Sequence, residues 1–266
     1  MSSQPRPAPQ TTRRARRAAE RRTVAPRRVP SRGGRSPVLL ITALIGGLGV
    51  LALGALILLQ GGGTKVDTTG LVAPILPTPT ALADGRAIGK ADAPVTIEVW
   101  SDFQCPVCGE LARTVEPALV TKYVTPGTLR IVHHDAAFQG AKSSSSYDES
   151  VESAAGARCA AVQGRYWPFQ DWTFANQSGE NEGAFAADRL KAIATEAGLD
   201  IPAWQTCIGA GDQQKAVRAE TAQAVAAGVN ATPTMVLNGT TIVGLRSVTE
   251  LGGLIEAAAA KAAAGG

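Results

Sequence analysis

The spacing of two cysteines limits the possible folds of this chain more than any other feature. Two residues separate Cys105 from Cys108, and both follow residues 95–100, a run that predicts a β-strand. A strand that leads directly into a helix at two such thiols is typical of a redox-active disulfide. Free N–H groups at the start of a helix stabilise a thiolate, so we predict that Cys105 is the nucleophile. Cys108 is then the resolving thiol, which releases a protein bound to Cys105.

The same spacing also occurs in zinc sites and in purely structural disulfides, and both remain alternatives at this point. A zinc site needs two further ligands. Cys159 and Cys207 are isolated in the sequence, and His133 and His134 are neighbours, which is not zinc-finger spacing. We therefore predict no metal, and no cofactor besides a redox-active disulfide between the two cysteines of the motif.

Three segments resemble the DsbA-like branch of the thioredoxin fold. Residues 101–108 read SDFQCPVC, and residues 228–239 read GVNATPTMVLNG. Residues 165–177 are similar to the helical insertion of that family. The resemblance covers roughly residues 85–262. It implies an α/β protein with a thioredoxin fold and an inserted helical subdomain, and it implies thiol-disulfide oxidoreductase activity.

In that family, the step that corresponds to Thr232-Pro233 is a cis peptide that faces the two cysteines. The resemblance implies that the backbone of Thr232 hydrogen-bonds a bound substrate chain, while Pro233 keeps the site open and blocks stray metal binding. A proline just before a strand is also compatible with the sheet, because it has no N–H to donate to the ladder. Without the cysteine motif, the same dipeptide is an ordinary turn before a strand.

Two positions depart from the family pattern. Many thioredoxin-fold enzymes bury an acid six residues before the first cysteine, where this chain has Val99. The neighbouring Glu98 is expected on the opposite face of the sheet, because side chains alternate along a strand. Between the cysteines stand Pro106, which suits the first turn of a helix, and Val107, where strongly oxidising members carry histidine. The direction of electron flow therefore stays open.

The remaining cysteines and the two histidines are predicted to be structural. If Cys105 and Cys108 form one bridge, Cys159 and Cys207 are left as the only other pair, and we expect a disulfide between predicted helices. Some DsbA-like proteins carry such a bridge. The two adjacent histidines end a predicted strand at residues 129–134, so at least one points away from the site, and we expect neither to be catalytic.

The N-terminal region predicts a membrane anchor. Residues 1–37 contain eleven arginines and one glutamate, which leaves a net charge of −6 for residues 38–266 of a chain with +4 overall. We expect this basic tail to be disordered and cytoplasmic, and not to bind nucleic acid. Residues 38–59 carry no charge and are long enough to cross a bilayer, so we predict a signal-anchor helix at residues 38–60. A cleavable signal peptide is the alternative, but no cleavage site follows closely.

The rest of the chain is predicted to be a linker and one domain. Residues 61–86 are rich in Gly, Pro and Thr and are expected to be a flexible linker. Residues 87–262 then form the thioredoxin-fold domain, with the helical insertion at about residues 140–227. The pattern predicts strands at 95–100, 129–134, 234–237 and 241–243, and helices at 106–124 and 248–262.

These observations predict a membrane-tethered, extracytoplasmic thiol-disulfide oxidoreductase. We expect a single-pass protein of the cell membrane that introduces disulfides into unfolded or partly folded exported proteins. A quinone-linked membrane partner that reoxidises the enzyme is implied by the resemblance alone. Two alternatives remain: a reductase or isomerase of exported proteins, and a peptide-binding or chaperone module that uses the groove beside Thr232-Pro233.

Overall fold

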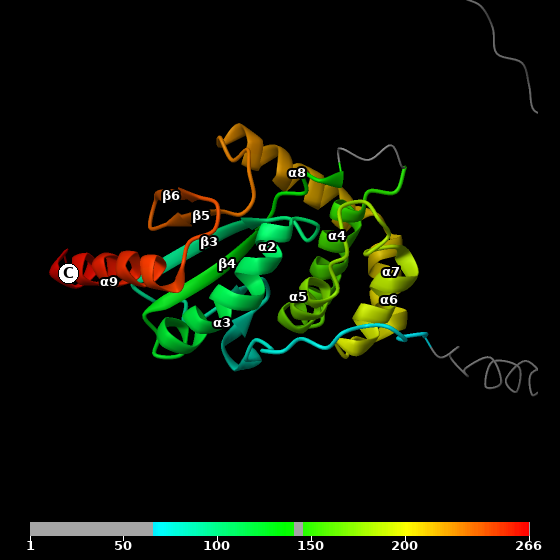
Figure 1. Ribbon diagram of the computed structural model, residues 1–266, viewed down its shortest axis with the longest axis horizontal. Helices are drawn as coiled ribbons and strands as arrows, with labels where there is room; N and C mark the ends of the chain where they lie inside the picture. Colours follow the sequence, from blue (N-terminus) through cyan, green and yellow to red (C-terminus); the bar gives the residue numbers. More distant parts are fainter. Residues whose placement is uncertain (1–65, 141–145, 266) are drawn as a thin grey trace, which may run out of the picture. The chain divides into compact units, whose positions relative to one another are not determined.

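A mixed β-sheet forms the centre of the computed structural model, which describes residues 66–140 and 146–265 (Figure 1). The strand order within these residues is β1-β2-β4-β3-β5-β6. Only β3 and β4 are parallel to each other, and every other neighbouring pair is antiparallel. The strands are β1 (Ala83–Asp84), β2 (Ala87–Ile88), β3 (Val95–Ser101), β4 (Leu129–Asp135), β5 (Thr234–Leu237) and β6 (Thr240–Val243).

Strand β3 lies at the middle of the sheet because its alternate residues are apolar. Val95, Ile97 and Val99 are each at most 2% exposed and form the core face. Ile97 is in register with Ile131 of β4 and with Leu237 of β5. The strands predicted from alternation are confirmed to within a residue or two at each end.

The helix between β3 and β4 is continuous over residues 106–124, as predicted, but it contains two π-helical turns. It consists of α2 (Pro106–Glu110), a π-segment (Leu111–Val115), α3 (Glu116–Leu119) and a second π-segment (Val120–Val124). Pro117 has no N–H to donate to the preceding turn, so the hydrogen-bond ladder widens around it instead of breaking. The sequence pattern alone did not predict these π-turns.

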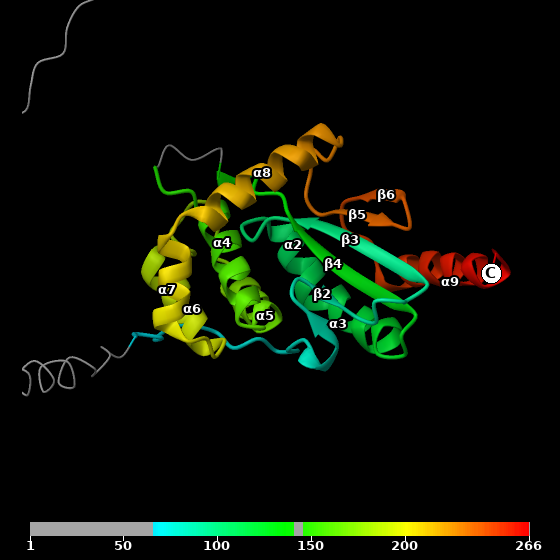
Figure 2. The same cartoon turned by 180° about the vertical axis from the view of Figure 1, so that it is seen from behind.

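The helical insertion packs around one central helix. Helix α4 contacts α5, α6, α7 and α8. Figures 1 and 2 show α4 to α7 at one end of the domain, beyond the sheet, and α8 running from that end back over the sheet. Helix α8 returns along β4, and α9 contacts β3 and α3. The helices are α4 (Glu149–Val162), α5 (Tyr166–Ala175), α6 (Ala187–Glu196), α7 (Ile201–Gly209), α8 (Asp212–Ala226) and α9 (Val248–Gly265).

A disulfide and a buried tryptophan hold the insertion together and attach it to the sheet. Cys159 of α4 and Cys207 of α7 are bonded at 2.05 Å. Trp167 is 1% exposed, and its indole N–H donates to the Ala87 carbonyl of β2 at 3.1 Å. Because both helix α5 and strand β2 take part in this contact, the two parts of the domain share one core.

The segment before the sheet differs from the predicted flexible linker. Residues 66–79, which we call the N-terminal strap, run along the helical insertion as the cyan trace in Figure 1. Asn176 hydrogen-bonds both the N–H and the carbonyl of Val72, and Asp171 accepts two hydrogen bonds from Thr78. The domain therefore begins earlier than the predicted boundary at residue 87. Prolines and glycines indicated an irregular backbone, but not its contacts with side chains far away in the sequence.

The remaining predictions for the N-terminal region concern residues 1–37, 38–60 and 61–65, which lie outside the described residues. Within residues 66–140 and 146–265, none of the helices combines the length and the apolar character that crossing a membrane requires.

Candidate active site

Cys105 and Cys108 lie at the junction of β3 and α2. Cys105 is the N-cap residue of α2, and its N–H donates to the Asp102 carbonyl in the turn after β3. Pro106 occupies the first helical turn, where the missing N–H breaks no hydrogen bond. Both thiols are free and buried, at 3% and 1% exposure, while Val107 between them is 42% exposed. The sequence at this junction therefore places two thiols on one helical turn with an apolar rim beside them.

The two thiols differ strongly in acidity. A hydrogen bond from the Cys108 side chain lowers the pKa of Cys105 to about 6; burial opposes this, and the Thr232 side chain and the Val107 and Cys108 N–H groups contribute further. Burial raises the pKa of Cys108 well above its usual range, and the nearby Cys105 sulfur adds to this shift. At neutral pH, Cys105 is therefore the thiolate and Cys108 the thiol, which is the division of roles expected for a nucleophile and a resolving group.

The loop before β5 faces the nucleophile. The Thr232-Pro233 peptide is cis, and the Cys105 thiol lies 3.4 Å from the Thr232 carbonyl oxygen. Strand β5 begins at the next residue, Thr234, whose hydroxyl donates to the Ala231 carbonyl. The structure thus brings together two segments that are 127 residues apart in the sequence.

A buried carboxyl group close to the cysteines was not predicted from the sequence. Asp102 is 2% exposed and accepts hydrogen bonds from the N–H groups of Gln104 and Gln139, both at 2.9 Å, and from the Ser150 hydroxyl at 2.8 Å. Burial raises the pKa of Asp102 to about 6, although these hydrogen bonds oppose the shift. The carboxyl group ties the active-site loop to the loop after β4 and to helix α4.

A second polar contact holds the backbone of the nucleophile itself. The Gln177 amide donates to the carbonyls of Phe103 and Cys105, at 2.6 and 3.0 Å. Its oxygen accepts from Arg113, which also donates to the Phe174 carbonyl. A Cβ at Gly109 would lie 2.0 Å from the Gln177 amide oxygen, so a larger residue there would displace this side chain from its place across α2. Gln177 was part of the segment that resembled the family insertion, but nothing in its spacing indicated this contact.

Val99 and Glu98 lie where strand alternation predicts. Val99 is buried in the core, and Glu98 is exposed on the other face of the sheet. No carboxylate therefore occupies the position six residues before Cys105.

The two histidines are held by carboxylates from other elements. His133 is 3% exposed, lies 2.9 Å from a Glu116 oxygen and packs edge-on against Trp167. His134 lies 2.9 Å from Glu220 of α8 and stacks on Trp100. These contacts fix both rings on opposite faces of β4.

No metal centre is formed by the part of the chain that the structure describes. Within residues 66–140 and 146–265, no group of three or more His, Cys, Asp or Glu side chains is placed to hold an ion. The zinc alternative for the cysteine motif would require two further ligands.

A thioredoxin family model matches residues 81–257, and the chain belongs to this family. The match extends from the start of the sheet to helix α9 and includes both cysteine pairs. Together with the cysteine site, it defines the chain as a thiol-disulfide oxidoreductase of the DsbA-like type.

Two relatives from Bacillus have names that refer to disulfide bond formation. The "Probable disulfide bond formation protein D" of Bacillus cereus is 26% identical over 162 residues, which is 60% of this chain and 72% of the relative. The protein of the same name from Bacillus anthracis matches equally well.

Solved structures show the same fold. BdbD from Bacillus subtilis superimposes with a TM-score of 0.59 at 18% identity, covering 71% of this chain and 99% of that one. Wolbachia pipientis alpha-DsbA1 gives 0.59 at 19% identity, with 71% and 96% covered. Reduced DsbA from Mycobacterium tuberculosis gives 0.53 at 25% identity, with 68% and 100% covered.

Proposed function

We propose that this protein introduces disulfides into exported proteins. The observation that carries the proposal is the pair of free thiols at the start of α2, with the Cys105 sulfur 3.4 Å from the Thr232 carbonyl oxygen. The opposite pKa shifts of the two thiols agree with one nucleophile and one resolving group. In the oxidised enzyme, a substrate thiolate attacks the Cys105 sulfur and Cys108 leaves. A second substrate thiolate then attacks the substrate sulfur of the mixed disulfide, which releases an oxidised substrate and the enzyme dithiol.

The acidity of Cys105 favours the oxidising direction. A thiolate that is stable at neutral pH stabilises the dithiol relative to the disulfide, so the disulfide gives up its oxidising equivalents more readily. The pKa of about 6 for Cys105 lies between the values of about 3.5 for DsbA and about 7 for thioredoxin. The side chain of Val107 supplies no charge or hydrogen-bond donor that would lower this pKa beyond what its backbone N–H does. The direction of this shift supports a disulfide donor.

The proposal includes the membrane location that the sequence predicts. An anchor at residues 38–60 with a cytoplasmic basic tail places the catalytic domain outside the cytoplasm, where protein disulfides persist. Each turnover leaves Cys105 and Cys108 reduced, so an electron acceptor must restore the disulfide. A quinone-linked membrane protein fits that requirement. The names of the Bacillus relatives support a role in disulfide formation.

A reductase or isomerase of exported proteins is the second candidate, and it uses the same geometry. The valine at position 107 favours it, because the strongly oxidising members of the resembled family carry a histidine there. The peptide-binding module is the third candidate, and it requires no chemistry at Cys105.

The reduction potential of the Cys105–Cys108 pair separates these functions. We would equilibrate the full chain in glutathione buffers and measure the fraction of the enzyme dithiol. A potential toward about −120 mV supports the oxidase, whereas a value near about −270 mV identifies a reductant. If the pair does not exchange with glutathione at all, and Cys105→Ala leaves peptide binding intact, the binding module is the correct function.

A further inference from the structure

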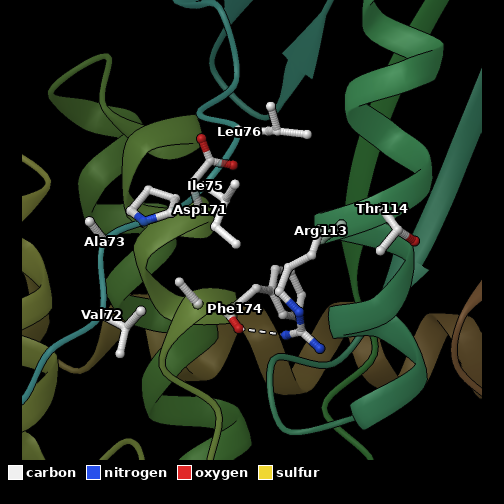
Figure 3. A pocket seen from close by; sticks show the side chains of 11 residues that line it. Val72, Ala73, Ile75, Leu76, Arg113, Thr114, Asp171 and Phe174 are labelled. Carbon is white, nitrogen blue, oxygen red and sulfur yellow. Dashed lines mark hydrogen bonds between the residues drawn. The ribbon is translucent and has the colours of Figure 1, made fainter.

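Two neighbouring hollows lie beside the active-site helix. The first, of about 310 Å³, is bordered by Gln104 and Pro106, the two residues that flank Cys105. The second, of about 290 Å³, lies between the N-terminal strap, the first π-segment and α5 (Figure 3). Both are lined by Arg113, Phe174 and Ala175, so they adjoin along these residues. None of their lining residues belongs to the Thr232-Pro233 loop. The two hollows, which together we call the groove, thus lie next to each other on the side that faces the helical insertion. The first borders the neighbours of Cys105, the second lies under the strap, and the Arg113 side chain, which donates to the Phe174 carbonyl, borders both.

The strap presents apolar side chains without burying them. Val72 is 60% exposed, Ile75 is 92% exposed and Leu76 is 59% exposed. All three line the second hollow (Figure 3). Of the eight large apolar side chains that are exposed in the described residues, these three lie on the strap, and a fourth, Val107, lies between the two cysteines. Exposed apolar groups collected in this way are characteristic of binding surfaces.

The strap is held rigid in this arrangement. Asn176 binds both backbone groups of Val72 at one end, and Asp171 binds the N–H and hydroxyl of Thr78 at the other. Between these points, Pro74 and Pro77 restrict the backbone. An apolar surface that is already ordered loses little conformational entropy when a ligand covers it.

We propose that the hollow under the strap is a subsite for an apolar side chain of the polypeptide whose cysteine reacts with Cys105. The proposal rests on the proposed function, because the exchange reaction is what places a polypeptide over Cys105. Gln104 and Pro106 flank Cys105 and border the first hollow of the groove. A polypeptide that is bound at Cys105 therefore lies next to the groove. Unfolded exported proteins expose apolar side chains near their cysteines, and a folded surface does not. A hollow receives an inserted side chain better than it receives a flat lipid surface or a second copy of the domain.

The test uses the full chain with Cys108→Ala, so that mixed disulfides persist. The probes are short peptides with one cysteine in a Gly/Ser/Thr background, each carrying a single leucine at a different distance from the cysteine. The cysteine is bonded to nitrothiobenzoate. The Cys105 thiolate attacks the peptide sulfur, the enzyme–peptide disulfide forms, and coloured nitrothiobenzoate thiolate leaves. The same adduct of glutathione serves as a probe too small to reach the strap.

We expect one leucine position to raise the rate about tenfold over the all-polar peptide. Ile75→Asp and Leu76→Asp should remove that preference, because they place a charge in the hollow, and should leave the glutathione rate unchanged. Val162→Asp is the matched control, since Val162 is 75% exposed and lies outside the groove. Replacing the peptide leucine by lysine should restore part of the preference with the two strap substitutions, but not with Val162→Asp.

Two results would overturn the subsite. One is that no leucine position changes the rate; the other is that the preference survives both strap substitutions. If the strap substitutions change only membrane binding or self-association, the apolar surface serves that other contact. If Cys105 does not react even with the glutathione probe, the proposed function itself fails, which is a different outcome from loss of the leucine preference alone.

Discussion

The two cysteine pairs of this domain differ in their spacing, in their surroundings and in whether they are bonded. Cys105 and Cys108 are three positions apart at the start of α2, and their thiols are free. Cys159 and Cys207 are 48 residues apart, lie within α4 and near the end of α7, and are bonded. The first pair has helix N–H groups and a second polypeptide loop beside it, whereas the second joins two packed helices.

The surroundings of each thiol pair determine whether it is reactive. Hydrogen bonds to one sulfur and burial of the other separate the pKa values of Cys105 and Cys108, so one bond can break and form repeatedly. A bridge across a loop of 48 residues mainly restricts the unfolded chain, and its value increases with loop length. Sequence separation and helix position thus account for the different roles of the same chemical group.

The largest effect is expected from removing the nucleophile. Cys105→Ala should abolish thiol-disulfide exchange with every substrate, because Cys108 is buried and its pKa is raised well above the usual range. Exchange is measured as oxidation of a reduced, unfolded protein by the disulfide form of the full chain. Cys108→Ala is the control that keeps the nucleophile, and it should accumulate the mixed disulfide. Substantial exchange by Cys105→Ala would show that the two thiols are interchangeable.

Removing the second pair should have the complementary effect. The double substitution Cys159→Ala and Cys207→Ala is expected to lower the free energy of unfolding by about 2 to 4 kcal/mol, because the unfolded chain gains freedom. Urea denaturation of both proteins measures this difference. The exchange rate in the absence of urea should change by less than about twofold. If the folded double variant lost most of its exchange activity, the Cys159–Cys207 bridge would take part in electron transfer and would not be purely structural.

The acidity of the reactive pair can be measured directly. Since the pKa of Cys105 is lowered to about 6, alkylation of the reduced protein by iodoacetamide should increase through pH 6 and level off above about pH 7. Only Cys105 should be modified until the protein unfolds, which peptide mapping can show. An alkylation midpoint near the ordinary thiol value of about 8.5 would contradict the division of roles between the two thiols.

The same shift affects stability with a definite sign. The folded pKa of Cys105 lies below the unfolded value, so the folded dithiol is stabilised above the unfolded pKa and loses this contribution as the pH falls through about 6. The disulfide form has no such group and should lack this part of the pH dependence.

Most of the site could be predicted because its signals are local. The motif at Cys105 and Cys108, the alternating residues of β3 and the Thr232-Pro233 step are each readable within a few positions. The strand-helix-strand order then places them together through the topology of the fold. The pairing of Cys159 with Cys207 followed by elimination once the first two cysteines were assigned to each other.

The rest depends on contacts between distant segments that leave no periodic pattern. Asp102 is a loop residue in the sequence, and only the fold buries it against Ser150, 48 positions away. Gln177 is 72 positions from Cys105. The strap looked like a linker because its three prolines and one glycine describe backbone shape, whereas its order comes from the side chains of Asn176 and Asp171.

The smallest effect is expected from changing Gln177, which connects the helical insertion to the active-site cysteines. Gln177 lies just after α5, in the insertion that contains the bonded pair, and it donates to the Cys105 carbonyl of the reactive pair. Gln177→Leu keeps the size of the side chain and removes the amide. We expect the free energy of unfolding to fall by about 1 kcal/mol, since partly buried carbonyls lose a donor. The alkylation midpoint of Cys105 should also move upward, because the first turn of α2 is less firmly held.

Gln223→Leu is the matched control, because Gln223 is exposed on α8. If Gln177→Leu lowers stability but leaves the alkylation midpoint where it was, Gln177 only braces the insertion. If both change, the helical insertion contributes to the reactivity of a pair that it does not contain. The two cysteine pairs would then differ in role while remaining physically connected through one amide.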